Sequence, residues 1–389
     1  MSAILIAEHF GIQKQKSKVK RAVPDVKWLF ALLVTSVSPG ILWAGWDIQS
    51  IDTGGKTTVF SFSIDKNDNA HISWYRAGVI NYLKYQDPKS VPVLIDSGTW
   101  MNDGDLAISV NKDGQPNLAY CNENNKHLEY AHLSDGTWEK EIVVNQQKGY
   151  TLPPCSFVSV AVDNSGSPRI VFSDTNTGAL KYAKLVKGKW FTQDIDLDGQ
   201  MSFAVLAFNA ENIPAVAYYD VKRKQLKYAR DTGIDWSTST ICNEPAGRSL
   251  SIGFVNLAPE ICYFSVAEEQ TLKLANWGGK GWRNLKPKCL KLVGSKWEVS
   301  SADLKDDTIA GGTIVIDKQG VSHIAYLSRT ENTIVYAKKT NKGWQAQTLA
   351  QVQANSIPKL VINDAGLPRI IYPDKGGLKY LVYREWNCL

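Results

Sequence analysis

Three aspartates at alternate positions, Asp194, Asp196 and Asp198, are followed by Gly199. This spacing fits the start of a calcium loop, in which alternate carboxylates converge on a hard cation. The position of the closing glutamate is occupied by Val205, and Asp196 falls where other copies of the repeat described below end an outer strand. We therefore expect these aspartates to serve strand ends, and we predict no metal ion and no cofactor.

Acid–base or nucleophilic chemistry has little support in the residue types. The chain has five histidines and contains no His-Glu-x-x-His, no Gly-x-Ser-x-Gly and no phosphate-binding glycine-rich loop before a helix. His71 and His323 occupy equivalent positions of the repeat, which favours a role in the scaffold over a catalytic pair. We assign no catalytic residue, and the sequence favours a protein that is not an enzyme.

Polar residues end the second strand of each repeat and form the candidate ligand-binding set. They are Arg76, Asn122, Asp174, Asp220, Ser265, Ser328 and Asp374. In a ring these residues would surround one face near the central channel. Carboxylate, amide and hydroxyl groups around one opening suit recognition of a polyol or a cation. The simpler interpretation is that Asp174 and Asp220 cap the turns that follow them, and both interpretations stay open.

The strands that position these residues are predicted by an internal repeat. Each copy has a strand, a turn with Gly or Asn, a second strand with an aromatic residue, a third strand resembling Leu-Lys-Tyr-Ala, and then Trp. The third strand recurs at Leu83, Leu128, Leu180, Leu226, Leu272, Ile334 and Leu378, with spacings of 45, 52, 46, 46, 62 and 44. Such a period is typical of propeller blades. We predict an all-β, seven-bladed β-propeller of four-stranded antiparallel blades.

The third repeat illustrates the expected blade. Its four strands are predicted at Phe157–Asp163, Arg169–Ser173, Leu180–Leu185 and Trp190–Asp196. Within the second strand, the large residue Phe172 points to one face and its smaller predecessor Val171 to the other. The same alternation of large and small residues in most repeats lets neighbouring blades interdigitate.

The two ends of the chain complement each other. Trp46–Asp52 matches the outer strand Trp190–Asp196 but has no earlier strands of its own. The last repeat ends soon after its third strand, at Leu378–Arg384. We predict that the N-terminal strand pairs with the last blade and closes the ring, which removes an exposed sheet edge.

The fifth repeat is longer than the others. Its 62-residue spacing contains two tryptophans, Trp282 and Trp297, and Leu290-Lys-Leu292 imitates Leu272-Lys-Leu274. A duplicated hairpin inserted in the fifth blade is the simplest explanation. The segment Lys280–Lys288 is basic and aromatic, which we interpret as a solvated hairpin, with a contact surface as the alternative.

The first 44 residues differ from the rest of the chain. Basic residues from Lys14 to Lys27 precede the apolar segment Trp28–Val37 and then Ser38–Gly40, the order of a secretory signal. The alternative is a membrane anchor, because Trp28–Trp46 approaches the roughly 20 residues that span a bilayer. We expect residues 1–44 to be a signal peptide or anchor, and residues 45–389 to form a single propeller that is secreted or held in the cell envelope.

Charge and cysteine content restrict the partners and the compartment. Before Ala44, six basic residues face two acidic ones, so most of the formal net charge of +6 lies outside the repeats. We see no basic stripe on the repeats and predict no nucleic-acid partner. All six cysteines follow the N-terminal segment, and an even number in an exported chain permits disulfides, with buried free thiols as the alternative.

The segment Pro214–Asp220 with Leu226–Ala229 and Trp236 resembles repeats of exported bacterial β-propellers of the sialidase-like (BNR-like) superfamily. Ser134–Trp138 resembles, in compressed form, the Asp-box turn of sialidases, whereas Lys187–Trp190 does not match it. The resemblance covers nearly all residues after Ala44 and implies the fold but not an activity.

Sialidases also carry an arginine triad, and the resemblance raises Arg76, Arg169 and Arg369 as its members. Arg169 and Arg369 start their strands whereas Arg76 ends its own, so the three should not share a face. We therefore predict an extracytoplasmic, non-catalytic binding module for a glycan or protein ligand. The alternative is a glycan-active hydrolase of sialidase-like type, using carboxylates such as Asp174 and Asp220.

Overall fold

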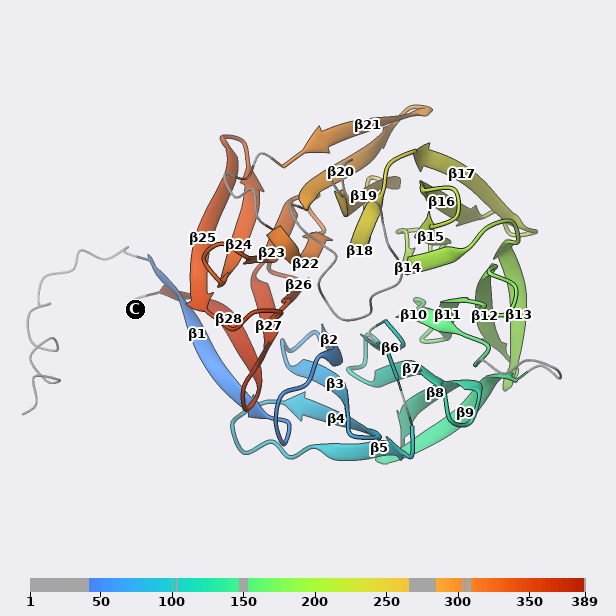
Figure 1. The fold of residues 1–389 in the computed structure, drawn as a ribbon, viewed down its shortest axis with the longest axis horizontal. Helices are drawn as coiled ribbons and strands as arrows, with labels where there is room; N and C mark the ends of the chain where they lie inside the picture. The colour runs from blue at the N-terminus through green and yellow to red at the C-terminus, as the bar shows by residue number, and fades with distance from the viewer. Residues whose placement is uncertain are drawn as a thin grey trace, which may run out of the picture. The chain divides into compact units, whose positions relative to one another are not determined.

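Seven four-stranded sheets stand around a common axis (Figure 1). The computed structural model describes residues 42–99, 101–102, 104–146, 153–265, 285–302, 304 and 309–387. Residues 44–384 form one compact unit, and the sheets belong to it. The predicted all-β, seven-bladed propeller is confirmed.

The first four blades follow the chain in order. Blade one contains β2 (Val59–Ile64), β3 (Ala70–Arg76), β4 (Val79–Tyr85) and β5 (Val93–Ser97). Blade two contains β6 (Leu106–Val110), β7 (Pro116–Asn122), β8 (His127–Ser134) and β9 (Thr137–Asn145). Blade three contains β10 (Ser156–Val162), β11 (Pro168–Ser173), β12 (Leu180–Val186) and β13 (Lys189–Asp196). Blade four contains β14 (Met201–Phe208), β15 (Pro214–Asp220), β16 (Gln225–Asp231) and β17 (Trp236–Cys242).

The last three blades complete the ring. Blade five contains β18 (Ala246–Val255), β19 (Ala258–Ser265), β20 (Lys286–Val293) and β21 (Lys296–Ser301). Blade six contains β22 (Ile309–Ile316), β23 (Ser322–Ser328), β24 (Thr333–Thr340) and β25 (Gly343–Gln351). Blade seven combines β26 (Lys359–Ile362), β27 (Pro368–Asp374) and β28 (Gly377–Asn387) with β1 (Leu42–Asp52). The first strand of each blade lies nearest the axis and the fourth lies at the rim (Figure 1).

The N-terminal strand closes the ring as predicted. β1 pairs with β28, so the sheet of blade seven has the order β1-β28-β27-β26. Between these two strands, Lys379 Nζ donates a hydrogen bond to Ser50 Oγ at 2.6 Å. Blade seven therefore joins both ends of the described chain in one sheet.

Large and small residues of neighbouring blades interdigitate, which confirms the expected packing. The seven buried clusters of the described residues lie one at each blade interface, and in six of them an aromatic side chain of one second strand meets the smaller residue of the preceding blade. The pairs are Trp74 with Ile371, Phe172 with Ala119, Tyr218 with Val171, Tyr263 with Ala217, Tyr326 with Cys262, and Tyr372 with Ala325. The aromatic rings are almost fully buried, so truncating one to alanine should cost about 3–5 kcal/mol.

A second contact explains why Trp recurs in the outer strands. At five interfaces the tyrosine of a third strand packs edge to face on the tryptophan of the next outer strand, with ring centroids 4.9–5.6 Å apart. The pairs are Tyr82–Trp138, Tyr130–Trp190, Tyr182–Trp236, Tyr228–Trp297 and Tyr336–Trp46. Edge-to-face pairs are a favoured geometry for aromatic rings, so these contacts help to hold the blades in register.

The predicted third strand of the fifth blade is wrong. It is β20, in which Cys289 pairs with Cys262 and Leu290 with Ile261, whereas Leu272 lies outside the described residues. By register, Pro287–Leu290 occupies the place of Leu-Lys-Tyr-Ala in the other repeats, and the exchange of Leu for Pro and of Tyr for Cys hides the motif. The duplicated hairpin predicted for this repeat falls between β19 and β20, at positions 266–284, which lie outside the described residues. Of the basic segment Lys280–Lys288, the last three residues begin β20.

Four of the cysteines form two disulfides, Cys121–Cys155 and Cys262–Cys289, and Cys242 is a free, half-buried thiol. Disulfides of this kind are typical of proteins from oxidising compartments outside the cytoplasm. Within the described residues, we find no helix with the length and apolar character needed to span a bilayer. The N-terminal segment proposed as a signal or anchor lies outside the described residues up to position 41.

Candidate functional site

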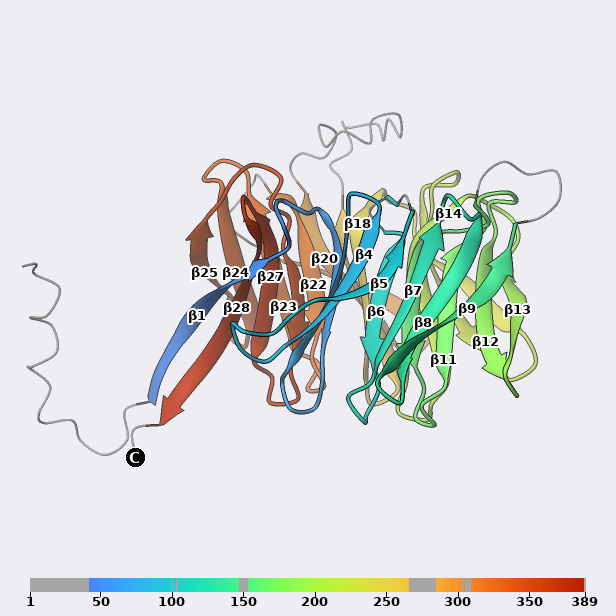
Figure 2. The same cartoon turned by 90° about the horizontal axis from the view of Figure 1, so that it is seen from below.

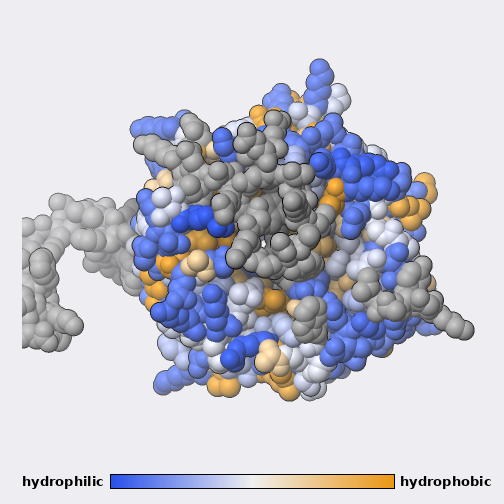
Figure 3. Space-filling view, viewed as in Figure 1, coloured by the Kyte–Doolittle hydropathy of each residue, from blue (hydrophilic) through white to orange (hydrophobic). Residues whose placement is uncertain are grey.

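The seven candidate ligand-binding residues end second strands and therefore lie at one face of the ring. The same antiparallel pair of first and second strands is repeated around the axis in all seven blades, so all second strands end at the same face. Figures 1 and 3 view this face directly, and Figure 2 shows it at its upper edge. We call it the strand-end face. The expected arrangement around one face is thus what the fold produces.

Most of these side chains are not accessible, which differs from the expected open ring. Asn122, Asp174, Asp220, Ser265 and Ser328 are buried, and Asp374 is half-buried. Arg76 alone among the seven is exposed. Around the outer part of this face hydrophilic residues predominate, and apolar residues occur in small groups (Figure 3).

The buried members of the set stabilise the turns that follow them. Asn122 Oδ1 accepts hydrogen bonds from the backbone N–H groups of Asn124 and Asn125, at 3.2 and 3.0 Å. Asp174 Oδ1 accepts one from Asn176 N at 2.9 Å, and its other oxygen lies 3.4 Å from Lys181 Nζ. These contacts are the turn-capping geometry that the simpler interpretation of the sequence describes.

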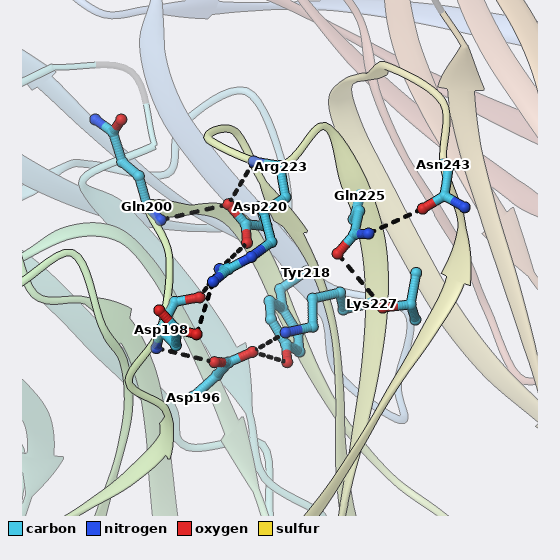
Figure 4. Close-up of polar contacts among 10 residues, drawn as sticks. Asp196, Asp198, Gln200, Tyr218, Asp220, Arg223, Gln225, Lys227 and Asn243 are labelled. Carbon is cyan, nitrogen blue, oxygen red and sulfur yellow. Dashed lines mark hydrogen bonds and ion pairs between the residues drawn. The ribbon is translucent and has the colours of Figure 1, made fainter.

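Asp220 belongs to a chain of polar contacts between β13 and the β15–β16 turn (Figure 4). Its Oδ1 accepts hydrogen bonds from Arg223 N at 3.1 Å and Gln200 N at 3.4 Å, and its Oδ2 lies 3.0 Å from Arg223 Nη1. The same guanidinium lies 2.7 Å from Asp198, whose side chain is 84% exposed. Arg223 therefore connects a buried carboxylate to one at the surface.

The three aspartates of the calcium-like motif have three different cationic partners. Asp194 pairs with Lys181 at 3.0 Å, Asp196 with Lys227, and Asp198 with Arg223. Each carboxylate is thus directed to its own partner, in agreement with a role at strand ends.

His71 and His323 are completely buried, and each joins an aspartate to a tyrosine. His323 Nε2 lies 3.0 Å from Asp317 Oδ2 and its Nδ1 lies 2.6 Å from the Tyr336 hydroxyl. His71 makes the equivalent contacts with Asp65 and Tyr82. Burial lowers the pKa of both imidazoles, against the opposing effect of the neighbouring aspartates. The repetition in two blades fits the predicted role in the scaffold.

The three arginines considered as a carboxylate-binding triad do not converge. Arg169 pairs with Asp163 at 2.7 Å and Arg369 pairs with Asp68, both where second strands begin. Arg76 ends β3 on the strand-end face. The expectation that the three arginines do not share a face is met.

Asp105 is a titratable group of the strand-end face that the sequence analysis missed. The side chain is 3% exposed and accepts hydrogen bonds from Asn102 N at 3.0 Å and Phe157 N at 3.3 Å. Burial raises the pKa of its carboxyl group to about 7, and nearby Glu123 adds to the effect. Because Asp105 precedes a first strand rather than ending a second one, the repeat gave no signal for it.

One group of three potential metal ligands occurs among the residues that the structure describes, formed by Glu260, Cys262 and Cys289. The two sulfur atoms are joined in a disulfide, so Glu260 is the one remaining ligand of this group. The repeat could not single out Glu260, because the residue type at this strand position varies between blades. The equivalent residues include Asn117, Arg169 and Ala215.

Comparisons with known proteins define the class of protein and no more. No family model and no curated protein matches this chain. The polysaccharide lyase Uly1 is 10% identical, with a TM-score of 0.52 over 84% of this chain and 89% of that one. The GH74 xyloglucanase Xcc1752 from Xanthomonas campestris is 14% identical, with a TM-score of 0.55 over 86% of this chain and 53% of that one. AofleA from Arthrobotrys oligospora is 12% identical, with a TM-score of 0.47 over 79% and 90%.

At these identities the likeness shows the fold alone, so the class is that of seven-bladed β-propellers.

Proposed function

We propose that this protein is a non-catalytic binding module for a glycan or protein ligand outside the cytoplasm. The observation that carries the proposal is the state of Asp174 and Asp220, the candidate binding residues that the hydrolase alternative would use as catalytic carboxylates. Both are buried, held by backbone N–H groups of turns, and paired with Lys181 and Arg223. Carboxylates fixed in this way maintain the shape of the face and are poorly placed to exchange protons with a substrate.

Glycans are the first ligand class to test. Uly1 and Xcc1752, which share the fold, are a polysaccharide lyase and a xyloglucanase. The hydrophilic residues that predominate around the outer part of the strand-end face also suit a hydroxyl-rich ligand (Figure 3). The two disulfides support a location in the cell envelope or the medium. The proposal includes both alternatives for residues 1–44, a signal peptide that releases the propeller or an anchor that tethers it to the membrane.

A second candidate function, a glycan-active hydrolase of sialidase-like type, is favoured by Asp105. Asp105 is about as buried as Asp174 and Asp220 and is likewise held by backbone N–H groups, but among the described residues it has no cationic partner. Its pKa near 7 suits a general acid, because a catalytic acid works best when its pKa lies near the working pH. The resemblance of Ser134–Trp138 to the Asp-box turn supports the same family relationship.

The experiment uses the full chain, secreted so that its disulfides form, on a glycan array and in protein pull-downs. Saturable binding without turnover supports the binding module. Hydrolysis of a glycoside that is lost in Asp105→Asn would contradict it and establish the hydrolase. Asp113→Asn, in the exposed β6–β7 turn, is the matched control for that variant.

A further inference from the structure

A pocket of about 460 Å³ lies between blades five and six, on the face where second strands begin. This volume falls within the range of about 300–1,000 Å³ that is usual for small-molecule sites. Its wall is formed by β19, β20 and β21 of blade five and by two turns of blade six. The lining residues used below are Glu260, Lys291, Glu298, Ser300, Lys339 and Asn341.

The pocket lies beside the exchange of one residue in the repeat. In blades one to four and in blade six, the third-strand tyrosine packs against the next blade's tryptophan. In blade five that position is Cys289, which is joined to Cys262 instead. The corresponding pocket between blades two and three, where Tyr130 is present, measures about 260 Å³. A cysteine is much smaller than a tyrosine, so the interface of blades five and six retains more open space.

Glu260 supplies a buried carboxylate with spare hydrogen-bonding capacity in this pocket. The residue is 7% exposed, and among the described residues its side chain accepts one hydrogen bond, from Ser322 Oγ at 3.5 Å. A carboxylate can accept about four hydrogen bonds, and buried polar groups without partners are rare in native proteins. Burial raises the pKa of Glu260, while the ammonium groups of Lys339 and Lys291 oppose that rise.

Equivalent positions of other blades are better satisfied. His71 contacts both Asp65 and Tyr82, and Arg369 contacts both Asp68 and the Tyr383 carbonyl. Loss of the tyrosine at position 289 removes the partner that Glu260 would otherwise have. The pocket therefore combines open volume with a buried acceptor that has one hydrogen-bond donor, Ser322, among the described residues.

The surrounding charges select the chemical class of the ligand. Two acidic residues, Glu260 and Glu298, are matched by two basic ones, Lys291 and Lys339. Because the acidic and basic groups balance, the pocket has no net electrostatic preference for a cation or for an anion. In a vicinal diol, one hydroxyl can donate to a carboxylate while its neighbour accepts from an ammonium group. Ser300 and Asn341 add further neutral partners at the rim.

We propose that the pocket between blades five and six binds a neutral sugar, with Glu260 as the central hydrogen-bond acceptor and Lys339 as a donor. The ligand class rests on the proposed function, but the site lies on the opposite face from the strand-end residues. The two proposals can therefore be separated by mutation.

The test measures binding of glucose, galactose, mannose and xylose to the full secreted chain by saturation-transfer NMR and calorimetry. Glucuronate and glucosamine serve as the charged comparators. We expect at least one neutral sugar to bind with a dissociation constant in the millimolar range, as is usual for a small ligand. We expect Glu260→Gln to weaken binding at least tenfold and Lys339→Ala several-fold. Lys342→Ala removes an exposed charge from the adjacent turn and should leave the dissociation constant of the sugar unchanged.

Unchanged sugar binding in both Glu260→Gln and Lys339→Ala overturns the site. If that binding is instead lost in Arg76→Ala with Asp374→Asn, the proposed binding function stands and only this inference fails. If the wild-type chain binds none of these sugars but captures a protein partner, the inference fails together with the glycan part of the function. Lys339 is exposed, so Lys339→Ala remains informative if Glu260→Gln does not fold.

Discussion

Trp46 and Tyr336 meet edge to face, with ring centroids 5.4 Å apart, although they come from opposite ends of the described chain. The indole nitrogen of Trp46 also donates a hydrogen bond to Gln347 Oε1 at 3.1 Å. Trp46 thus does for blade seven what Trp138 and Trp190 do for blades two and three. Ring closure therefore reuses a contact that is found at four other blade interfaces.

Replacing Trp46 by alanine should weaken closure. The side chain is half-buried, so we expect a loss of about 2–3 kcal/mol in the free energy of unfolding, below the cost of a fully buried aromatic. Urea unfolding followed by tyrosine and tryptophan fluorescence and by circular dichroism measures the change. Ile48→Ala, on the same strand but 47% exposed, should cost much less. Equal losses for the two variants would show that the Trp46 contact has no special role.

The fold could be predicted because the repeat carries its own packing rule. An aromatic residue beside a small one, as in Phe172 and Val171, recurs in most blades and forms the interface in each. The strand whose predicted position was wrong is the third strand of blade five. There a covalent bond between Cys262 and Cys289 replaces the Ala–Tyr pair, and local sequence alone does not show which cysteines pair.

The candidate site was less predictable, because position in a repeat does not determine exposure. The seven strand-end residues share a face as expected, but Asp220 is buried against Arg223 whereas Arg76 is exposed. Asp105 and Glu260 lie outside that set, and their properties arise from burial between blades. Burial of this kind depends on partners that are distant in sequence.

Asp220 should prove structural. Removing this buried carboxylate leaves the backbone N–H groups of Gln200 and Arg223 without their acceptor, so Asp220→Ala should lower the free energy of unfolding by about 2–3 kcal/mol. Thermal and urea unfolding check this value. Asp198→Ala removes the other, 84% exposed partner of Arg223 and should cost less than about 1 kcal/mol. A stable Asp220→Ala protein that has lost a measured activity would instead assign Asp220 to catalysis.

Asp105 should make the stability depend on pH near neutrality. Its pKa is raised from 3.8 in the unfolded chain to about 7 in the fold. The contribution of Asp105 to the free energy of unfolding is therefore fully present below pH 3.8. It is lost as the pH rises to 7, because the folded state must then bury a charged carboxylate. At about 1.4 kcal/mol per pH unit, Asp105→Asn should gain about 2–3 kcal/mol over the wild type between pH 5 and pH 8.

Urea unfolding at the two pH values measures this gain. Asp113→Asn, an isosteric change in an exposed turn, provides the control and should follow the wild type at both pH values. A constant difference between Asp105→Asn and the wild type would mean that Asp105 does not titrate in this interval.

The disulfide Cys262–Cys289 and the pocket beside it can be tested with one pair of variants. Cys262→Ala with Cys289→Ala removes a cross-link between residues 27 positions apart and should cost about 2–4 kcal/mol. Cys262→Ala with Cys289→Tyr also removes the cross-link but restores the Ala–Tyr pair of Ala217 and Tyr228 in blade four. The restored tyrosine should recover part of the lost stability, because it buries its ring against the neighbouring blade as Tyr228 does against Trp297.

The tyrosine at position 289 should also fill the pocket and abolish sugar binding, whereas the variant with two alanines should still bind the sugar. A tyrosine variant that binds sugar as the alanine pair does would show that the exchange of tyrosine for cysteine is not what opens the interface.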